Sequence, residues 1–456
     1  MKKTNLLTGL FMAAMLLFSA ISHAQYSGGS GTSGDPYQIA TKDDLIELSN
    51  TSGDWGDYFI QTDDIAFDAT EANVDWNGDG SAGPAEGFSP IGNWTTKFTG
   101  AYNGDGHTIS NLYIDRSSTS QIGLFGYTNG ATIQNIGLID VDIKGVNGVG
   151  GLVGYNYNNS TVENSYSTGS VYGERTVGGL VGLNVLFSTV SKSFSHCDVT
   201  RASGSFGITN FGGFCGYNNK ATIEYCYSTG DVIYDGDANP TDKGFVGYDD
   251  SGNYTANFFD SDASNQSSDA VGAATAKTTP EMQLIETYTD ETTVGLTSAW
   301  DFVGTENDDS GTNDYWGINY NGQNNGYPFL SWQNYDHVVS QPGLWIGAED
   351  ADWHNSNNWD DGQVPGASVD VTIPETGNDP VISSAATCQN ITIQANSTLT
   401  INSNQTLAVT GNFTLEANGD FTNNGTLLFS GSDCHLSDNR ATKSSLGNII
   451  VYETAL

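Results

Sequence analysis

One short acidic segment has the residue types and the spacing of a calcium-binding loop. Oxygen-bearing side chains alternate along it, a glycine stands where such loops turn sharply, and a glutamate occupies the twelfth position: Asp75, Asn77, Asp79, Gly80 and Glu86. Pro84 lies inside the loop and its flanks are not clearly helical, so an EF-hand proper is not expected. Two interpretations stay open, a solvated turn or a lone structural Ca²⁺ site. The ligands of that site would be Asp75, Asn77, Asp79 and Glu86.

The remaining charged side chains offer little for catalysis. A polysaccharide lyase needs a base, often Lys or Arg, and a cation that stabilises the carbanion-like state, but the chain has only 14 Lys+Arg. A glycoside hydrolase needs two carboxylates at a defined separation, and among 53 Asp+Glu such pairs arise by chance. The histidines have no metal-ligand or triad spacing. We expect no enzyme, and keep a polysaccharide lyase or glycoside hydrolase as the alternative.

The chain of 456 residues is acidic because it has few basic residues. Its formal net charge is −39, although only 15% of residues are charged. This balance excludes a basic nucleic-acid-binding surface and a polybasic membrane patch. Aromatic residues make up 11% of the chain, which argues against disorder. The 56 glycines indicate an extracellular, β-rich protein with many turns.

The first 24 residues have the pattern of a Sec-type signal peptide. Lys2 and Lys3 precede an apolar run from Leu6 to Ala20, and a small-x-small site ends at Ala24. The run is short for a membrane-spanning helix, and no second run of spanning length follows. We predict a secreted or cell-surface protein, with no membrane insertion after cleavage; a retained anchor is the alternative.

Five cysteines are too few for a disulfide framework in a chain of this length. The last two could pair in an oxidising compartment, or all could be buried thiols. Because their number is odd, at least one is unpaired or forms an intermolecular bond. The five are Cys197, Cys215, Cys226, Cys388 and Cys434.

A short glycine-rich phrase recurs along the first half of the chain, with Gly178-Gly179-Leu180-Val181-Gly182 as one copy. Its second position falls at residues 123, 151, 179, 213 and 244, at intervals of 28, 28, 34 and 31. Short runs of alternating apolar and polar residues follow, bounded by Gly, Asn and Ser, which predicts strands. A repeat of about 30 residues cannot bury its apolar face alone, so the copies must stack.

Stacking of the copies predicts an all-β protein, a right-handed parallel β-helix. A propeller is the less favoured alternative, because a repeat of about 30 residues is short for a four-stranded blade. The inward positions would be Ile133, Val162, Val190 and Ile223. A second register position predicts a ladder of side-chain amides at a turn, formed by Asn111, Asn135, Asn164 and Asn257.

The recurring phrase resembles the GLUG motif of secreted and surface-exposed bacterial repeat proteins, of a Bacteroidetes type. The resemblance extends to an opening at residues 28–40, a first full rung at 98–109 and a close at 327–332, so it covers roughly residues 26–333. It implies surface display, adhesion or glycan contact, and no shared catalytic residues. We therefore expect an adhesin-like or structural, non-catalytic protein whose partners are extracellular glycans or host or environmental surface ligands.

Short helices are expected to cap this solenoid. Thr41 and Asp44 form a capping box that would begin a helix at the N-terminal end. Thr279 is a candidate N-cap with Pro280 at the first helical position. The second helix would lead into an aromatic cap on the far end, which contains Trp300, Phe302 and Trp316.

The second half has the pattern of a separate solenoid. Pairs of apolar residues begin at Ile391, Leu399 and Leu407, eight residues apart. Before them stands a Trp-rich segment that resembles the opening of repetitive Bacteroidetes surface proteins; its tryptophans form either a packing core or a sugar platform, and they are Trp345, Trp353 and Trp359. We assign residues 1–24 to the signal peptide, 25–333 to the GLUG-repeat β-helix, 334–343 to a linker and 344–456 to the Trp-rich segment and second solenoid. The pattern stops within a strand, so we expect a truncated chain, with a genuine terminus as the alternative.

Tyrosines recur across the repeats of the first half, and they too have two interpretations. Their rings could stack on one another within the solenoid. Alternatively, exposed rings could contact the faces of sugars. The tyrosines concerned are Tyr155, Tyr157, Tyr166, Tyr172, Tyr217 and Tyr227.

Overall fold

The computed structural model describes most of the chain after the signal segment. The described residues are 26–67, 86–202, 210–234, 237–238, 243–270, 272–290, 292–303, 314–318, 323–333, 335, 343–360, 363–431, 434–443 and 445–452. The predicted signal peptide lies outside these residues and stays a prediction. Most of the predicted linker, residues 334–343, lies outside them as well.

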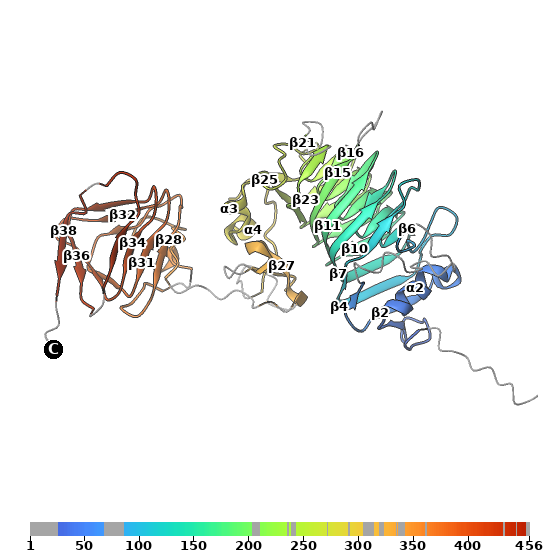
Figure 1. The fold of residues 1–456 in the computed structure, drawn as a ribbon, viewed down its shortest axis with the longest axis horizontal. Helices are drawn as coiled ribbons and strands as arrows, with labels where there is room; N and C mark the ends of the chain where they lie inside the picture. Colours follow the sequence, from blue (N-terminus) through green and yellow to red (C-terminus); the bar gives the residue numbers. More distant parts are fainter. Residues whose placement is uncertain are drawn as a thin grey trace, which may run out of the picture. The chain divides into compact units, whose positions relative to one another are not determined.

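The chain divides into two compact units between Val338 and Val339. Each unit has a hydrophobic core of its own. Both units are built mainly from strands that pair in parallel with the strand one coil away (Figure 1), and the antiparallel pairs β20–β21 and β26–β27 are local exceptions among the described residues. The prediction of an all-β parallel β-helix in two solenoid segments is confirmed.

The first unit winds through short strands with tight corners. Its strands are β1 (Tyr37–Ile39), β2 (Tyr58–Gln61), β3 (Ile65–Ala66), β4 (Ala101–Ser110), β5 (Tyr113–Asp115), β6 (Phe125–Asn129), β7 (Thr132–Lys144), β8 (Val149–Gly150), β9 (Val153–Tyr157), β10 (Thr161–Glu163), β11 (Tyr166–Gly173), β12 (Thr176–Gly178), β13 (Val181–Val185), β14 (Thr189–Ser191), β15 (Phe194–Arg201), β16 (Asn210–Gly212), β17 (Cys215–Asn219), β18 (Thr222–Glu224), β19 (Tyr227–Ser228), β20 (Val232–Tyr234), β21 (Asp237–Ala238), β22 (Val246–Asp250), β23 (Asn253–Thr255), β24 (Phe258–Asp260) and β25 (Thr275–Lys277).

Successive coils of this unit lie on one another in register. From β9 the chain runs through β10, β11 and β12, and it reaches β13, which pairs in parallel with β9. The strands collect into a large sheet that contains β10, β11, β14 and β15, a small sheet β8–β12–β16 and a five-stranded sheet β6–β9–β13–β17–β22. Figure 1 shows β7, β10, β11 and β15 side by side as rungs of the large sheet.

The predicted inward column forms the centre of the core. Strand pairing places its four members directly above one another, and all are at most 1% exposed. Parallel stacking therefore turns one apolar position of the repeat into a continuous hydrophobic column. The residues are Ile133, Val162, Val190 and Ile223, as predicted from the sequence.

The glycines of the recurring phrase are required by close contact between backbones. The phrase forms the corner between the small sheet and the five-stranded sheet. A β-carbon on Gly179 would lie 2.3 Å from the carbonyl oxygen of Gly213, one coil on. One on Gly182 would lie 2.5 Å from the carbonyl oxygen of Gly154, one coil back. Only glycine leaves room for coils this close.

The predicted amide ladder forms in part, and the register predicted for Asn257 is wrong. Asn164 Nδ2 donates to Asn135 Oδ1 at 2.6 Å, so these two side chains stack as expected. Asn111 instead donates to the backbone carbonyl of Phe67. Asn257 is one residue out of register, because Ile223 pairs with Tyr254 rather than with Thr255.

A left-handed backbone explains why asparagine recurs at this turn. Asn111, Asn135 and Asn164 have φ angles of 56°, 55° and 52°. Asparagine tolerates this conformation better than most residues do. The two following coils place Lys192 and Tyr225 there, at φ 47° and 53°. The turn keeps its left-handed backbone in these two coils. The amide ladder ends there, because Lys192 and Tyr225 have no side-chain amide.

A second amide ladder is buried inside the solenoid. Asn156 Nδ2 donates to Asn184 Oδ1 at 2.9 Å, and Asn184 Nδ2 donates to Asn218 Oδ1 at 2.9 Å. The ladder continues from Asn218 to the hydroxyl of Tyr254. Each amide supplies both a donor and an acceptor, which satisfies these polar groups within the core.

The predicted N-terminal helix is present. Helix α2 (Lys42–Asn50) has Thr41 as its N-cap, and the predicted capping box with Asp44 is formed. Its buried Leu45 and Leu48 belong to the same hydrophobic cluster as Phe59 of β2. The helix therefore covers the apolar interior beside β1 and β2, the first strands of the solenoid.

The second capping segment begins one residue earlier than predicted. Helix α3 (Thr279–Met282) has Thr278 as its N-cap, in a capping box with Glu281. The backbone N–H and the hydroxyl of Thr278 both donate to the Glu281 carboxylate. These bonds make Thr278 the N-cap, so Thr279 is the first residue of the helix. Helix α4 (Glu286–Thr289), β26 (Trp316–Gly317) and β27 (Phe329–Leu330) complete this segment.

This segment covers a side of the solenoid rather than only its far end. Stacked rings project outward from the large sheet, with Tyr166 and Phe194 4.7 Å apart and Phe194 and Tyr227 5.0 Å apart. Met282, Tyr288, Trp300, Phe302 and Trp316 share one buried cluster with these rings. Trp332 reaches the early coils, where it stacks on Tyr166 and donates to the carbonyl of Asn164.

The second unit is a smaller solenoid with three sheets. Its strands are β28 (Val371–Ile373), β29 (Val381–Ile382), β30 (Ala386–Cys388), β31 (Ile391–Ile393), β32 (Thr398–Ile401), β33 (Thr406–Val409), β34 (Phe413–Leu415), β35 (Asp420–Asn423), β36 (Thr426–Phe429), β37 (Leu436–Asp438) and β38 (Asn448–Val451). The apolar pairs spaced eight apart occupy the three sides of one coil, because β31, β32 and β33 belong to three different sheets. Ile391, Leu399 and Leu407 are buried.

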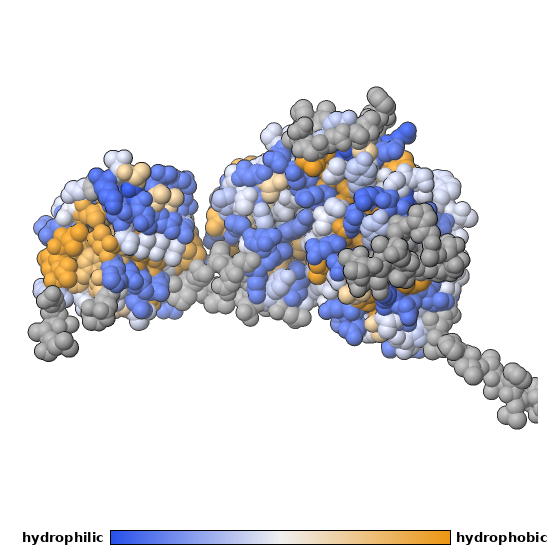
Figure 2. All heavy atoms as spheres, viewed as in Figure 1, coloured by the Kyte–Doolittle hydropathy of each residue, from blue (hydrophilic) through white to orange (hydrophobic). Residues whose placement is uncertain are grey.

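The last strand of this unit leaves apolar side chains at the surface. All four residues of β38 are exposed, with Val451 at 64%. Figure 2 shows hydrophobic residues gathered at this end of the second unit, whereas hydrophilic residues cover most of the face in view. Strand β38 pairs with β36 on one side only.

Candidate functional site

The five-stranded sheet of the first unit carries a row of mostly aromatic side chains on its outward face. Strand pairing places one residue from each strand in register. We call this set the tyrosine row: Tyr127, Tyr155, Leu183, Tyr217 and Tyr248. Neighbouring residues along each strand face the opposite way, and among them Asn156, Asn184 and Asn218 are buried.

The most exposed rings lie near the two ends of the tyrosine row, although Tyr127 itself is only 4% exposed. Trp94 lies next to Tyr127, with ring centroids 5.8 Å apart, and is 66% exposed. At the other end Tyr248 is 51% exposed and lies 5.5 Å from Tyr217. Tyr155 between them is half-buried. Aromatic surface is therefore available along the sheet, most of all at its two ends.

Polar side chains lie beside the tyrosine row on three of its strands, two residues further along: Asn129, Asn219 and Asp250, which we call the polar row. On β9 and β13 the same position holds Tyr157 and Val185 instead. Asn158 Nδ2 donates to Asn129 Oδ1 at 2.8 Å. Asn219 Nδ2 donates to Asp250 Oδ2 at 2.6 Å and to the hydroxyl of Tyr217 at 2.8 Å. This arrangement places amide and carboxylate groups at the edge of the aromatic surface, where they can bond a polar ligand.

The structure separates the tyrosines that the sequence grouped together. Tyr166 and Tyr227 are buried in the stack beneath the capping segment. Tyr155, Tyr157 and Tyr217 lie on the five-stranded sheet instead, whereas Tyr172 is on β11 of the large sheet. The stacking interpretation is confirmed for Tyr166 and Tyr227, and the sugar-contact interpretation stays a prediction for the tyrosines of the five-stranded sheet.

Sequence reasoning missed Tyr127, Tyr248 and Trp94. A local signal for the first two was present, since every member of the tyrosine row directly follows the last glycine of the recurring phrase. No such signal marks Trp94, which precedes the first copy of the phrase and reaches Tyr127 only through the fold. Burial raises the pKa of Tyr127 to about 12, so its phenol stays protonated at neutral pH.

His196 belongs to the packed aromatic region. Its ring centroid lies 4.9 Å from that of Phe194 and 5.4 Å from that of Tyr327, and Nε2 is 3.0 Å from the hydroxyl of Tyr227. Burial lowers the pKa of His196 to about 3. The neutral ring at pH 7 therefore has a packing role. The other described histidines lie apart from it, with His107 beside Asp64 and His354 in the second unit.

Two groups with shifted pKa values are held by structural bonds. Lys144 is partly buried, which lowers its pKa, but Asp142 at 3.3 Å outweighs this and the pKa is raised, so the amine is no base at neutral pH. Burial raises the pKa of Asp269 to about 7. Its carboxylate accepts the backbone N–H groups of Val246 and Ala274 at 2.6 and 2.8 Å, which fixes the last coil.

The cysteines are free thiols in the structure. Four are buried and Cys434 is half-buried, so the suggested bond between Cys388 and Cys434 is not formed. Burial raises the pKa of Cys197, Cys215 and Cys388 to about 12. Such thiols are poor nucleophiles, because the reactive form is the thiolate.

The predicted calcium loop lies almost wholly outside the described residues. Asp75, Asn77 and Asp79 are not described, and Glu86 is. The Glu86 carboxylate accepts a hydrogen bond from Arg116 Nη1 at 2.9 Å. Among the described residues, no group of three or more His, Cys, Asp or Glu side chains could hold a metal ion. The metal site therefore stays a prediction.

The three tryptophans of the second unit form a packing core, not an exposed sugar platform. Trp345, Trp353 and Trp359 are at most 1% exposed. Trp359 contacts both others edge to face, at centroid distances of 5.0 and 4.7 Å, and its Nε1 donates to the Trp353 carbonyl. These rings belong to the same cluster as the strand core of the unit.

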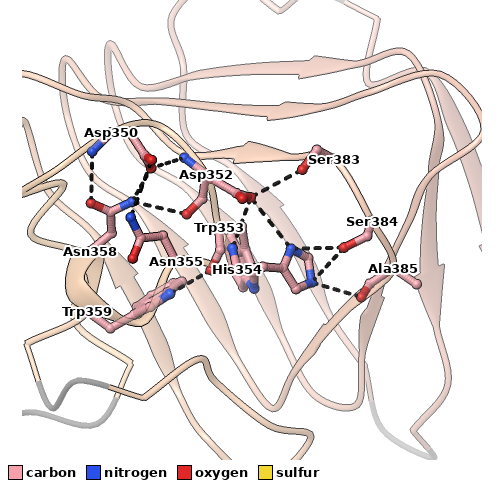
Figure 3. A network of polar contacts seen from close by, with 10 residues as sticks. All are labelled: Asp350, Asp352, Trp353, His354, Asn355, Asn358, Trp359, Ser383, Ser384 and Ala385. Carbon is pink, nitrogen blue, oxygen red and sulfur yellow. Dashed lines mark hydrogen bonds and ion pairs between the residues drawn. The ribbon is translucent and has the colours of Figure 1, made fainter.

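A polar network holds this Trp-rich segment to the neighbouring coil (Figure 3). Asp350 Oδ1 accepts from the backbone of Asp352 at 2.8 Å and from Asn358 at 2.7 Å, and these bonds lower the pKa of Asp350. Asp352 Oδ1 accepts from Ser383 at 3.1 Å, and His354 Nε2 lies 3.1 Å from the carbonyl of Ala385. The clustered Asn and Asp residues thus shape a loop around the tryptophans.

Comparison with known families identifies the repeat. The sequence profile of the GLUG motif matches residues 145–172 and 207–233, which contain the coil turns described above. The chain contains the GLUG motif at these two sites. A second profile, a domain of unknown function called DUF8693, matches residues 344–434 of the second unit.

Two relatives are similar in sequence to parts of this chain. Halomucin of Haloquadratum walsbyi is 40% identical over 148 residues, which are 32% of this chain and 2% of halomucin. A protein of Evansella cellulosilytica, provisionally named a Gly-rich membrane protein, is 32% identical over 170 residues, which are 34% of this chain and 18% of that one. The chain thus spans under a fifth of the length of either relative.

Among solved structures, a Bacteroides ovatus protein provisionally named an immunoglobulin A1 protease aligns with 68% of this GLUG-motif chain and 96% of its own. The identity is 19% and the TM-score 0.38, which carries no inference about activity. Within the described parts of the chain, none of the helices combines the length and the apolarity that crossing a membrane needs.

Proposed function

We propose that this GLUG-motif chain is a secreted or cell-surface, adhesin-like structural protein that presents its β-helix surface to extracellular glycans or surface ligands without catalysis. The observation that carries the proposal is the tyrosine row, a regular outward set in which Tyr155, Tyr217 and Tyr248 keep exposed surface, whereas Tyr127 and Leu183 are buried. A stacked repeat displays such a set at fixed intervals. The similarity to halomucin and to a Gly-rich membrane protein supports a place at the cell surface.

The alternative is a carbohydrate-active protein of another kind, a polysaccharide lyase or glycoside hydrolase on a β-helix. The groups with shifted pKa values do not favour it. Lys144 stays protonated at neutral pH, His196 is neutral and packed among aromatic rings, and Asp269 bonds the backbone of the last coil. Each of these three described groups is held by its own local contacts, and they do not form a pair of catalytic acid and base in one pocket.

A binding assay with a parallel turnover assay tests the proposal. The full chain is applied to an array of plant, algal and host glycans, and the same preparation is incubated with uronate polymers and with neutral polysaccharides. We expect binding on the array with no change in polymer length and no unsaturated or reducing ends released. Turnover above that of a heat-denatured control would overturn the non-catalytic assignment.

We also propose that the loop from Asp75 to Glu86 binds Ca²⁺ as a structural ion, with Asp75, Asn77, Asp79 and Glu86 as ligands. The alternating oxygen ligands support it. Calcium would have to draw Glu86 away from Arg116. We expect Ca²⁺ to raise the Tm of the first unit by a few degrees, because a ligand that binds only the folded state stabilises it.

Calorimetry with Ca²⁺ and with a chelator measures this effect. The variant Asp79→Asn should lose most of the shift, whereas Asp63→Asn, outside the loop, should keep it. A Tm that is the same with ion and with chelator would show that the segment is a solvated turn.

A further inference from the structure

We infer that the outward face of the five-stranded sheet binds a neutral polysaccharide that lies along the solenoid axis and stacks on Trp94, Tyr155, Tyr217 and Tyr248. This inference rests on the proposed function and assigns to it a surface, a direction and a class of ligand. The tyrosine row supplies the rings, and the polar row beside it supplies the hydrogen-bonding groups.

The direction follows from the stacking of the coils. Members of the tyrosine row stand on adjacent parallel strands, so they are separated by one strand spacing of about 4.8 Å. Three such steps from Tyr155 to Tyr248 span roughly 14 Å, with the buried Leu183 between Tyr155 and Tyr217. Trp94, which packs on the buried Tyr127, extends this aromatic strip. A strip that is long in one direction and one side chain wide suits an extended polymer rather than a compact ligand.

The composition of the strip favours a sugar over an apolar peptide. Rings pack against the C–H face of a sugar, and amides beside them bond its hydroxyls. Asn129, Asn219 and Asp250 lie in the polar row next to the rings. Leu183 is the one purely aliphatic member of the tyrosine row and is only 8% exposed, so the accessible surface consists of aromatic faces with polar edges.

The charge of the protein selects among polysaccharides. Asp250 is exposed at the Tyr248 end of the row, and Lys97 covers Trp94 and Tyr127 at the other, with Nζ 5.4 and 5.3 Å from the ring centroids. In the described part of this face the charges at the two ends have opposite signs, with Lys220 beyond Asn219 between them, so the basic groups form no continuous track for an anionic chain. The net charge of −39 repels polyanions at longer range. A neutral polymer avoids this cost, and its binding should be insensitive to salt.

Titration calorimetry of the full chain tests the inference with defined polymers: soluble xylan, mannan and β-glucan as neutral probes and polygalacturonate as the anionic one. Tyr248→Ala and Trp94→Ala should each weaken binding of the best neutral probe about 2- to 10-fold, the loss expected for one aromatic contact. Tyr58→Ala is the matched control, because Tyr58 is 44% exposed but lies on β2 of the large sheet, and it should leave Kd unchanged.

Each outcome decides a separate question. All three side chains are exposed, so each variant should have the Tm of the parent protein. Scanning calorimetry of the variants checks that they are folded. Binding of a neutral polymer that Tyr248→Ala and Trp94→Ala do not weaken overturns this surface and leaves the proposed function standing. Tighter binding of polygalacturonate than of every neutral probe overturns the ligand class. Binding of none of the four polymers overturns the inference, while host glycans on the array still test the proposed function.

Discussion

Replacing Gly182 by alanine should destabilise the first unit by about 3 kcal/mol or more, within or above the range for overpacked cores. The new β-carbon would lie 2.5 Å from the Gly154 carbonyl oxygen and 2.6 Å from the Val149 backbone nitrogen. Both obstacles are backbone atoms of the previous coil, so no side-chain rotation can relieve the contact. Because the coils share one core, the strain should lower the Tm of the whole unit by roughly 6 °C or more.

Differential scanning calorimetry measures this shift, and Gly53→Ala provides the control. A β-carbon at Gly53 meets no atom within 4 Å, and its φ is not positive, so this variant should melt within about 1 °C of the parent or slightly above it. Equal melting of the two variants would mean that the recurring glycines do not serve backbone contact between coils.

Replacing Trp359 by alanine should destabilise the second unit by about 3–5 kcal/mol, the usual cost of removing a buried aromatic side chain. Trp359 joins Trp345 and Trp353 through edge-to-face contacts and a hydrogen bond to the Trp353 carbonyl. The variant loses these contacts and leaves a cavity in the core. Only the transition of the second unit should move, since its core cluster shares no residue with those of the first.

Two calorimetric transitions are therefore expected, and the variant identifies which belongs to the second unit. Val451→Ala, at an exposed position of β38, is the matched control and should cost less than about 1 kcal/mol. A shift of both transitions in Trp359→Ala would show that the two units unfold as one. Loss of glycan binding without loss of stability would restore the sugar-platform interpretation of these tryptophans.

Register is the part of the fold that the degenerate repeats of this chain specify least well. The apolar column could be aligned correctly, since Ile133, Val162 and Val190 recur beside the same threonine. Asn257 was placed one residue away from its true position because Tyr254 does not resemble the earlier copies. A one-residue error moves a side chain to the opposite face of a strand, so a degenerate repeat loses this information first.

The candidate site could be predicted only in part. The repeat pattern marks Tyr155, Tyr157 and Tyr217, but it also marks Tyr166 and Tyr227, which the capping segment buries. Spacing along one coil does not tell which outward face is covered, because the covering residues come from a distant segment. Trp332, for example, contacts Tyr166 from 166 positions further along the chain.

The sequence by itself determined the stacked architecture. A glycine phrase and an alternating strand pattern repeat every 28–34 residues, and such repeats bury their apolar positions by stacking on one another. It also determined the N-terminal helix, whose capping box is local. Only the tertiary structure decided which aromatic rings face solvent. Burial of an outward side chain depends on what the rest of the chain lays over it, and that is a property of long-range packing rather than of local pattern.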